Sequence, residues 1–276
     1  MGHTPHRQRI SHHTVNKLFS CNPFGIQRIR GNLPLVTVSI VIPAFNEQRL
    51  LPATLAAVER ARAALTARGW ESEVIVCDNN STDRTAETAR AAGATVVFEP
   101  VNQISRARNS GAAAARGDWL VFVDADSEPS PGLFQDMADA IAGGRVLAGG
   151  STLYTERLSF WYSTFASLWC LWSRLARHMA GSFIFVETRA FRAIGGFSAT
   201  LFAAEELELS SKLKAMARQE RRTIVILHRN PLLTSARKAH LYTFRETMAF
   251  LVKTIFRPKR MLTDRDACAL WYDGRR

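Results

Sequence analysis

Acidic residues are absent from the first 46 positions of the chain, which hold five lysines and arginines, and the first carboxylate is Glu47. The chain of 276 residues has a net charge of +12. Residues 210–276 hold 16 basic and 5 acidic residues, whereas residues 47–209 hold 15 basic and 19 acidic ones. The excess of basic residues therefore lies at the two ends of the chain. This pattern favours either an anionic surface as a partner or a solvated charged face.

Motifs for nucleic-acid recognition are also missing, because the chain has no aromatic-interleaved RNA motif and no recognition helix. We therefore expect no nucleic-acid partner, and phospholipid headgroups are the anionic surface to test. The chain has four cysteines, and no two of them have the spacing of a zinc site or of a disulfide framework: Cys21, Cys77, Cys170 and Cys268. A reducing compartment fits best. We expect a cytoplasmic protein, with attachment to the inner face of the cell membrane left open.

Long apolar runs are missing as well. Residues 1–33 lack the continuous apolar core of a secretion signal, so we predict a disordered basic extension there. The most apolar stretch, within residues 157–174, runs for about 15 residues and is too short to span a bilayer. One helical face of it carries Leu158, Trp161, Phe165, Leu168 and Trp172. This helix is interpreted either as part of the core or as one that dips into a membrane surface or lines an acceptor site.

Strands and helices alternate from Val36 onward. Short apolar strands such as "VTVSIVIP", "EVIVCD" and "WLVFVDAD" are separated by helices of about a dozen residues. This alternation predicts an α/β fold with one Rossmann-like, mostly parallel sheet flanked by helices. We expect this domain to cover residues 34–240, with a basic amphipathic segment at 241–276 after it. The first turn reads "PAFNEQ", which disfavours both a dinucleotide-binding glycine loop and a Walker loop.

Polar residues follow several of these strands, and the carboxyl ends of parallel strands meet at one edge of a sheet. Asp124 and Asp126 are two positions apart, so both carboxylates can point to the same side of the chain. Hard cations such as Mn²⁺ or Mg²⁺ prefer oxygen ligands and share them with substrate phosphates. The same spacing recurs at Asp264 and Asp266 in a basic tail with no strand before it, and we interpret that second pair as surface charge.

Five motifs occur in a fixed order: "VSIVIPAFNE", "VIVCDNNSTDRT", "ARNSGAAAARGDWLVFVDAD", "GSFIFVETRAFRAIGGF" and "AAEELELSSKLK". Together, over residues 36–240, they resemble the family 2 glycosyltransferases of GT-A fold. The resemblance implies a hexosyltransferase that moves a sugar from a nucleoside-diphosphate sugar to a hydroxyl acceptor, either lipid-linked or a small molecule. It implies Mn²⁺ or Mg²⁺ as the cofactor. A single base and a direct displacement imply inversion at the anomeric carbon.

The same resemblance implies which residues bind the donor. The base and ribose are expected to lie among Pro43, Ala44, Glu47, Asp78 and Asn79. The family pattern at the second strand end is usually Asp-Asp-Gly-Ser, whereas this chain has "DNNS", which leaves the identity of the base open. Arg108 is expected to reach the diphosphate or the sugar, in preference to Arg106. Asp124 is expected to contact the sugar and ribose, and Asp126 to bind the metal.

The catalytic residues are also implied by the resemblance. The family's usual Glu-Asp pair falls on Glu205 and Glu206, and Glu206 is expected to be the base that takes the acceptor's proton. An ordinary helix start rich in acids would have the same sequence. His228, after the strand "RRTIVIL", is a candidate third metal ligand beside the aspartates, and a structural strand-end histidine is the alternative. The glycines of "AIGGF" predict a tight turn near the acceptor site or a helix end.

Two other functions are kept open. A sugar-1-phosphate nucleotidyltransferase has a similar α/β core, but it normally begins with a glycine-rich loop where this chain has "PAFNE". A basic interaction module on a transferase scaffold would explain the altered "DNNS" and "EEL" motifs. Substitution of Asp126 or Glu206 distinguishes an enzyme from an interaction module, because the enzyme loses turnover whereas the module keeps its partner.

Overall fold

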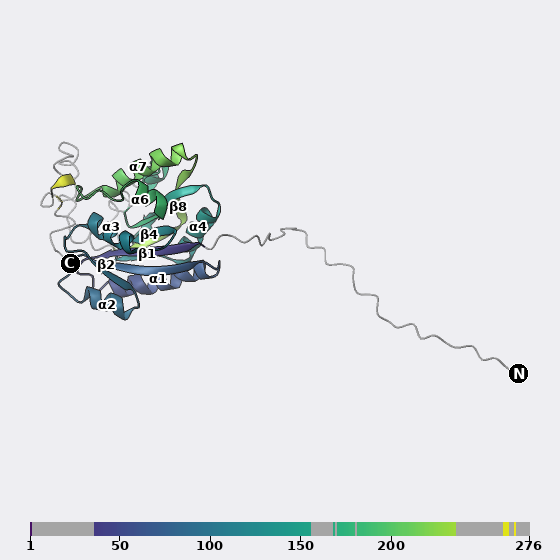
Figure 1. Cartoon of the computed structure of the whole chain (residues 1–276), viewed down its shortest axis with the longest axis horizontal. Coiled ribbons are helices and arrows are strands. Elements are labelled where there is room, and N and C mark those ends of the chain that lie inside the picture. Colours follow the sequence, from purple (N-terminus) through teal and green to yellow (C-terminus); the bar gives the residue numbers. More distant parts are fainter. Residues whose placement is uncertain are drawn as a thin grey trace. The chain divides into compact units, whose positions relative to one another are not determined.

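The computed structural model describes Met1 and residues 36–155, 168, 170–179, 181–235, 262–264 and 268 (Figure 1). The chain divides into two units between Pro34 and Leu35, and all the helices and strands described here belong to the second unit. The extension expected at 1–33 and the segment expected at 241–276 lie almost entirely outside the described residues.

The strands are β1 (Thr37–Ala44), β2 (Glu71–Asp78), β3 (Thr95–Phe98), β4 (Trp119–Val123), β5 (Ser127–Glu128), β6 (Val146–Tyr154), β7 (Phe183–Glu187) and β8 (Thr223–Thr234). The helices are α1 (Leu51–Thr66), α2 (Thr85–Ala91), α3 (Ile104–Ala114), α4 (Pro131–Ala142), α6 (Thr188–Ala193) and α7 (Glu205–Gln219). All strands form one sheet in the order β3-β2-β1-β4-β7-β6-β8-β5. Only β7 and β5 run against the other strands, so the predicted mostly parallel sheet is confirmed.

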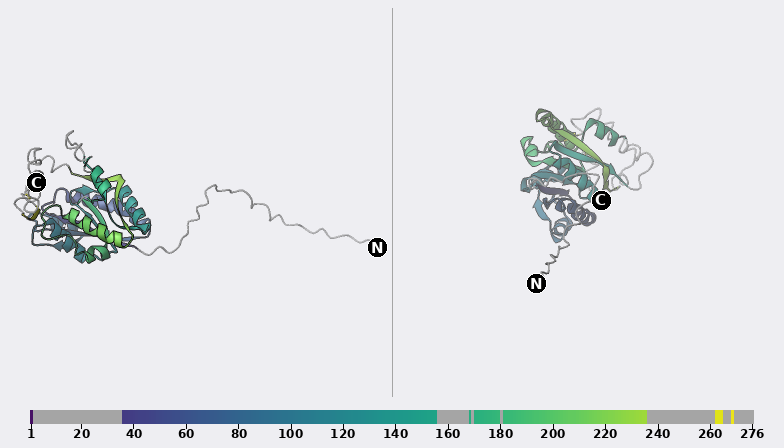
Figure 2. Two further views of the ribbon diagram at one scale, coloured as in Figure 1. Left: turned by 90° about the horizontal axis from the view of Figure 1, so that it is seen from above. Right: turned by 90° about the vertical axis from the view of Figure 1, so that its right-hand side faces the viewer.

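The sheet is covered on both faces, which explains why its strands are almost continuously apolar. In β1, Val38, Ile40 and Ile42 point to one hydrophobic core, which also contains apolar residues of α1 and α4. Val41 points to the other core, which is built with α3, α6 and α7. Figures 1 and 2 show helices on the two sides of the sheet. The alternation of side chains along one strand thus anchors both helical layers.

The sheet also curls, and the evidence is the short link between β4 and β5. Four strand-to-strand steps separate β4 from β5 in the sheet order, which would be about 19 Å in a flat sheet. Val123 and Ser127 are only four residues apart, which allows at most about 14 Å of extended chain. The far edge of the sheet must therefore bend back towards the end of β4. We call the link Asp124–Ala125–Asp126 the seam of the sheet.

The apolar stretch of residues 157–174 is described only in its last part, where Leu168 and residues 170–176 are helical. Leu168 and Trp172 are exposed there, so this part of the helix is not a core helix. None of the helices in the described part of the chain is both long and apolar enough to cross a bilayer.

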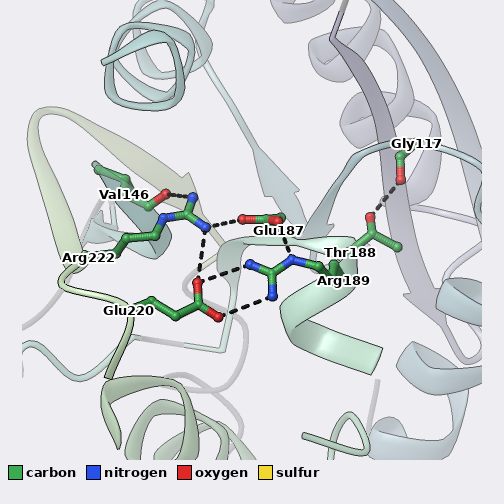
Figure 3. A network of polar contacts seen from close by, with 7 residues as sticks. All are labelled: Gly117, Val146, Glu187, Thr188, Arg189, Glu220 and Arg222. Atoms are coloured by element: carbon green, nitrogen blue, oxygen red, sulfur yellow. Dashed lines mark hydrogen bonds and ion pairs between the residues drawn. The ribbon is translucent and has the colours of Figure 1, made fainter. Parts of the chain in front are cut away.

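An ion-pair network joins α6 and α7 to the sheet at the edge opposite the seam (Figure 3). Arg189 makes paired contacts of 3.1 and 3.0 Å with the two carboxylate oxygens of Glu220. Arg222 contacts both Glu187 and Glu220 and donates to the carbonyl of Val146. This network fixes the carboxyl-terminal end of α7, while the amino-terminal end of α7 lies at the candidate active site.

Candidate active site

The ends of β1 and β2 form the first part of the site. Ala44 and Asp78 are paired neighbours, and the carbonyl of Ala44 accepts a hydrogen bond from the backbone of Asn79 at 2.8 Å. The two following loops bind each other, because Asn46 accepts from the backbone of Thr82 at 2.8 Å and the Glu47 backbone donates to Thr85 at 2.8 Å. The expected donor residues thus lie together at the ends of β1 and β2 and in the loops that follow them: Pro43, Ala44, Glu47, Asp78 and Asn79.

Asp78 and Asn79 already have partners inside the protein. One carboxylate oxygen of Asp78 accepts from the backbone of Ser81 at 3.1 Å. The side-chain amide of Asn79 donates to the carbonyls of Glu99 and Val101 at 3.3 and 2.6 Å. The amide nitrogen of Asn79 therefore holds the loop after β3, and the asparagine that replaces the family's usual aspartate has a structural role.

The seam brings Asp124 and Asp126 to the end of β4. The backbone of Asp124 donates to the carbonyl of Ser182 at 3.2 Å. Asp126 is held from the far edge of the sheet, since its carbonyl accepts from the backbone of Ser235 at 3.1 Å and its carboxylate from the Ser235 hydroxyl at 3.3 Å. The two aspartates are partly exposed, and each is anchored to a different segment of the chain.

Arg108 lies at the centre of a buried ionic cluster. Its guanidinium donates to Glu205 at 2.7 Å, to Asp124 at 2.9 Å and to the carbonyl of Gly181 at 2.9 Å, and the residue is only 2% exposed. Burial alone would lower the pKa of Arg108, but the charges of Asp124 and Glu205 raise it above its ordinary value. The arginine expected to reach the donor thus ties the end of β4 to the start of α7. Arg106 lies outside this cluster and pairs with Glu99 at 3.3 Å.

Glu206 lies beside this cluster at the start of α7. A Cβ atom placed on Gly181 would be 3.3 Å from the Arg108 guanidinium and 3.8 Å from the carboxyl carbon of Glu206, so both side chains pack close to this glycine. Loss of hydration by burial, together with the negative charge of Glu205, raises the pKa of Glu206 to about 8. A carboxylate with a pKa near neutral pH is suited to accept a proton during a reaction.

The loop before α7 is held by polar residues that the sequence analysis did not single out. Gln103 donates to the carbonyls of Ala199 and Leu201 at 2.9 and 2.8 Å. Asn109 both accepts from and donates to the backbone of Phe197, at 3.0 and 2.9 Å. The sequence contained one indication of this role. Gln103 precedes α3 and Asn109 lies within it, and amides are unusual beside the small residues of this alanine-rich helix. They position the turn that leads to Glu205 and Glu206.

The "AIGGF" glycines form the tight turn that was predicted. Gly195 and Gly196 have φ angles of +80° and +68°, a backbone conformation that glycine adopts without steric cost. The turn ends α6, and the backbone of Gly196 donates to the carbonyl of Phe191 at 3.0 Å. The glycines therefore both end α6 and form a tight turn, and the expected nearness of an acceptor site stays a prediction.

The structure does not bring His228 to the two aspartates. Ser235 contacts Asp126, whereas His228 lies within an irregular stretch of β8 between Leu227 and Leu232, and the three residues from Leu232 to Ser235 alone span about 10 Å of strand. His228 is exposed, and its ring nitrogen is 3.5 Å from the carbonyl of Ile226. The expectation that His228 completes the metal shell is therefore corrected, and the physical reason is the course of β8.

Of the second aspartate pair, Asp264 is partly exposed and Asp266 lies outside the described residues. The backbone carbonyl of Asp264 accepts from the backbone of Cys268 at 3.2 Å. Burial, and then the charges of Asp264 and Glu205, raise the pKa of Cys268 to about 11. The carbonyl of Leu262 accepts from the backbone of Phe202 at 2.7 Å. The described residues near the C-terminus thus contact the loop that leads into α7.

The carboxylates of the seam suit a hard divalent cation. In the part of the chain that the structure describes, no three His, Cys, Asp or Glu side chains gather closely enough to hold a metal ion by themselves. Mg²⁺ and Mn²⁺ sites at phosphate-transfer centres commonly use one or two carboxylates and fill the shell with substrate phosphates and water. Asp124 and Asp126, both partly exposed, match that donor set.

Comparison with known proteins identifies the family. The model of the family "Glycosyl transferase family 2" matches residues 39–194, more than half of the chain. The chain belongs to this glycosyltransferase family. The resemblance that its motifs carried is confirmed, and the nucleotidyltransferase alternative loses its support.

Among curated proteins, an uncharacterized glycosyltransferase of Mycobacterium bovis is 32% identical over 142 residues, which are 51% of this chain and 61% of that protein. An undecaprenyl-phosphate 4-deoxy-4-formamido-L-arabinose transferase of Pseudomonas aeruginosa is 34% identical over 128 residues, 42% of this chain and 35% of that protein. The matched part of the chain thus spans about three fifths of the first relative and about a third of the second.

Solved structures confirm the GT-A fold. The structure of S. aureus TarS 1–349 with UDP-GlcNAc has a TM-score of 0.58 and 19% identity, and the match covers 86% of this chain and 71% of that one. Glucosyl-3-phosphoglycerate synthase from Mycobacterium tuberculosis, solved with Mn²⁺, UDP and glucosyl-3-phosphoglycerate, has a TM-score of 0.55 and 19% identity, with 80% and 77% covered.

Proposed function

We propose that this protein transfers a hexosyl group from a nucleoside-diphosphate sugar to a hydroxyl group of an acceptor. The observation that carries the proposal is the cluster of Arg108, Asp124 and Glu205 beside Glu206, at the carboxyl ends of the parallel strands. Ligands of open α/β sheets bind at this edge. UDP is the first nucleotide to test, because the two structural neighbours described above were solved with UDP or a UDP-sugar.

Glu206 is the proposed base. A carboxylate with a pKa of about 8 is a stronger base than an ordinary one. It accepts the proton of an attacking hydroxyl only after it has lost its own, so turnover should rise as the pH approaches 8. Glu205 is held by Arg108 at 2.7 Å, and its negative charge contributes to the raised pKa of its neighbour. Glu205 is therefore a positioning residue, and Glu206 is the residue that we expect to touch the acceptor.

The donor side of the site uses the seam and the two loops after β1 and β2. Asp124 and Asp126 would hold Mn²⁺ or Mg²⁺, which supplies positive charge to the leaving diphosphate. Asp124 keeps a fixed orientation because Arg108 donates to it at 2.9 Å. Asp78 at the end of β2 and Glu47 in the loop after β1 are both buried, and we expect the nucleoside to bind beside them. One base and one direct displacement give inversion at the anomeric carbon, which NMR of the product would test.

The acceptor is proposed to be a hydroxyl compound, either lipid-linked or small. We also propose a cytoplasmic enzyme that attaches to an anionic membrane surface at the inner face of the cell membrane. The net charge of +12 and the concentration of basic residues at both ends of the chain support this attachment.

The first experiment is a thermal-shift series with UDP, GDP, CDP, ADP and dTDP, each with Mn²⁺, with Mg²⁺ and with a chelator. A ligand at about a hundred times its Kd stabilises a protein by roughly 2.7 kcal/mol, which corresponds to a rise in Tm of about 5–10 °C. We expect one nucleotide to give this shift, and only with metal. Asp126→Asn should abolish it.

The matched control is Asp118→Asn. Asp118 immediately precedes β4 at the edge opposite the seam, where it accepts hydrogen bonds from Thr37, so this variant should keep the nucleotide shift. A shift that persists in chelator would refute metal assistance. A shift that persists in Asp126→Asn would refute the role of this aspartate, and no shift with any nucleotide would refute the donor assignment.

A further inference from the structure

A stripe of exposed apolar side chains runs along the helical segment that includes residues 170–176. Its members follow the spacing i, i+3, i+4 and i+7, which places them on one face of a helix: Leu168, Leu171, Trp172 and Leu175, exposed by 61, 50, 43 and 77%. In a globular protein such a face normally packs against the core. Four of the eight exposed large hydrophobic residues in the described part of the chain lie on this single helix.

The helix has contacts on its other side that fix it to the fold. Ser173 is buried, and its hydroxyl donates to the carbonyl of His178. Met179 is buried, and its backbone donates to Ser210 of α7 at 3.1 Å. Cys170 contacts the carbonyl of Leu153, near the end of β6, at 3.8 Å. In Figure 2 the helix lies at the rim of the fold. The apolar stripe is therefore presented outward by an anchored helix.

Cations surround the stripe. A groove of about 590 Å³ lies between this helix, β8 and α4, and its lining includes Leu171, Leu175, Arg174, Arg177 and Arg229. Arg174, Arg177 and Arg229 are exposed. Burial lowers the pKa of Lys214, and the nearby charges of Arg218 and Arg177 lower it further, so these three cations lie close together.

Two carboxylates also line the groove. Asp139 pairs with Arg68, whereas Asp136 accepts from the neutral side chain of Asn230 at 3.0 Å and keeps its charge. Three arginines against these two aspartates leave the groove with a net positive charge. A second copy of the chain would bring two sets of these cations together, which Coulomb repulsion disfavours. A partner with an anionic outer layer over an apolar interior would match both the arginines and the apolar stripe.

We propose that Leu168, Leu171, Trp172 and Leu175, flanked by Arg174, Arg177 and Arg229, form a docking surface for an anionic phospholipid bilayer. Leucine and tryptophan enter the boundary between headgroups and acyl chains, while the arginines bind phosphate groups. The amino-terminal end of the helix lies towards the seam, because Leu153, which Cys170 contacts, pairs with Leu232, three residues before Ser235. The surface then runs along β8 to its start, where Arg177 donates to the hydroxyl of Thr223 at 3.2 Å. This proposal deepens the proposed membrane attachment, but it does not depend on transferase activity.

The test is co-sedimentation of the full chain with vesicles, without donor or acceptor. One set of vesicles contains phosphatidylcholine alone, and the other contains phosphatidylcholine with phosphatidylglycerol. We expect binding to the anionic vesicles that weakens when NaCl is raised, because salt screens surface charge. The double variant Leu171→Glu/Leu175→Glu should bind at least about tenfold more weakly, since both apolar side chains are lost from the interface.

Two further variants keep the test decisive. Phe98→Glu replaces an equally exposed apolar residue, 60% exposed at the end of β3, and should leave vesicle binding unchanged. Arg174→Glu reverses one exposed charge and should weaken binding to anionic vesicles without an effect on the apolar stripe. Equal binding by all variants overturns the proposal, as does equal binding to neutral vesicles. If the protein forms dimers without vesicles, and the double leucine variant is a monomer, the surface serves self-association and the proposal is overturned.

Discussion

Replacement of Glu206 by glutamine should stabilise the protein, and the gain should grow with pH. The pKa of Glu206 is raised from 4.5 to about 8 in the folded chain. In the unfolded chain this carboxyl ionises near its ordinary pKa, while the folded protein keeps the proton until about pH 8. Stability is therefore complete below pH 4.5 and falls as the pH rises towards 8, with a slope of about 1.4 kcal/mol per pH unit. Glutamine does not ionise, so the variant avoids this loss.

The expected gain is about 1 kcal/mol at pH 5 and at most about 3 kcal/mol at pH 7. Urea unfolding followed by tryptophan fluorescence at the two pH values measures it, and the turnover of the same variant should be lost. Glu208→Gln is the matched control, because Glu208 lies in the same first turn of α7 but forms an exposed pair with Lys212 at 2.7 Å. Its effect should stay below about 0.5 kcal/mol. Destabilisation of Glu206→Gln at pH 7, or a gain no larger than that of the control, would refute the argument.

Further predictions concern arginines. Arg108→Met leaves two carboxylates of the cluster without their buried partner and should destabilise the protein by about 3–5 kcal/mol. Arg106→Met should destabilise it by less than about 1 kcal/mol. Equal losses of stability in urea unfolding would contradict the burial of Arg108. In the network of Figure 3, Arg222→Ala should cost about 1–3 kcal/mol because its side chain is 21% exposed and binds a backbone carbonyl. Arg189→Ala removes a side chain that is 59% exposed and should cost less than about 1 kcal/mol, so a larger effect at Arg189 would reverse this ranking.

The sequence was sufficient to predict the parallel core of the fold. Short buried strands that alternate with helices form a parallel sheet, and the carboxyl ends of parallel strands lie at one edge. The sequence therefore predicted that Asp78 and Asp124 lie at the same edge. The glycines at 195 and 196 also had a unique physical reason, since both adopt positive φ angles. Strand patterns and turn conformations depend on residues close together in the sequence, so a single sequence is enough to predict them.

The failures came from long-range pairing. The family resemblance made His228 a candidate metal ligand near the aspartates, but β8 continues through an irregular stretch and meets the seam only at Thr234 and Ser235. The burial of Arg108 depends on Glu205, which is 97 residues away in the sequence. No periodicity within α3 distinguishes an arginine that faces carboxylates from one that faces solvent. The choice between Arg106 and Arg108 rested on the family resemblance alone.

The curl of the sheet has a consequence for the order in which the protein folds. Ser127 pairs with Thr234, and Asp126 with Ser235, across 107 and 109 residues of chain. Closing such long loops is entropically unfavourable until the intervening strands have formed, so contacts of this separation are made late. The two aspartates therefore receive their final surroundings in one of the last steps of folding. A chain that stops before Thr234 would contain nearly every strand and both aspartates, and it would still lack the contacts that Thr234 and Ser235 make with Ser127 and Asp126.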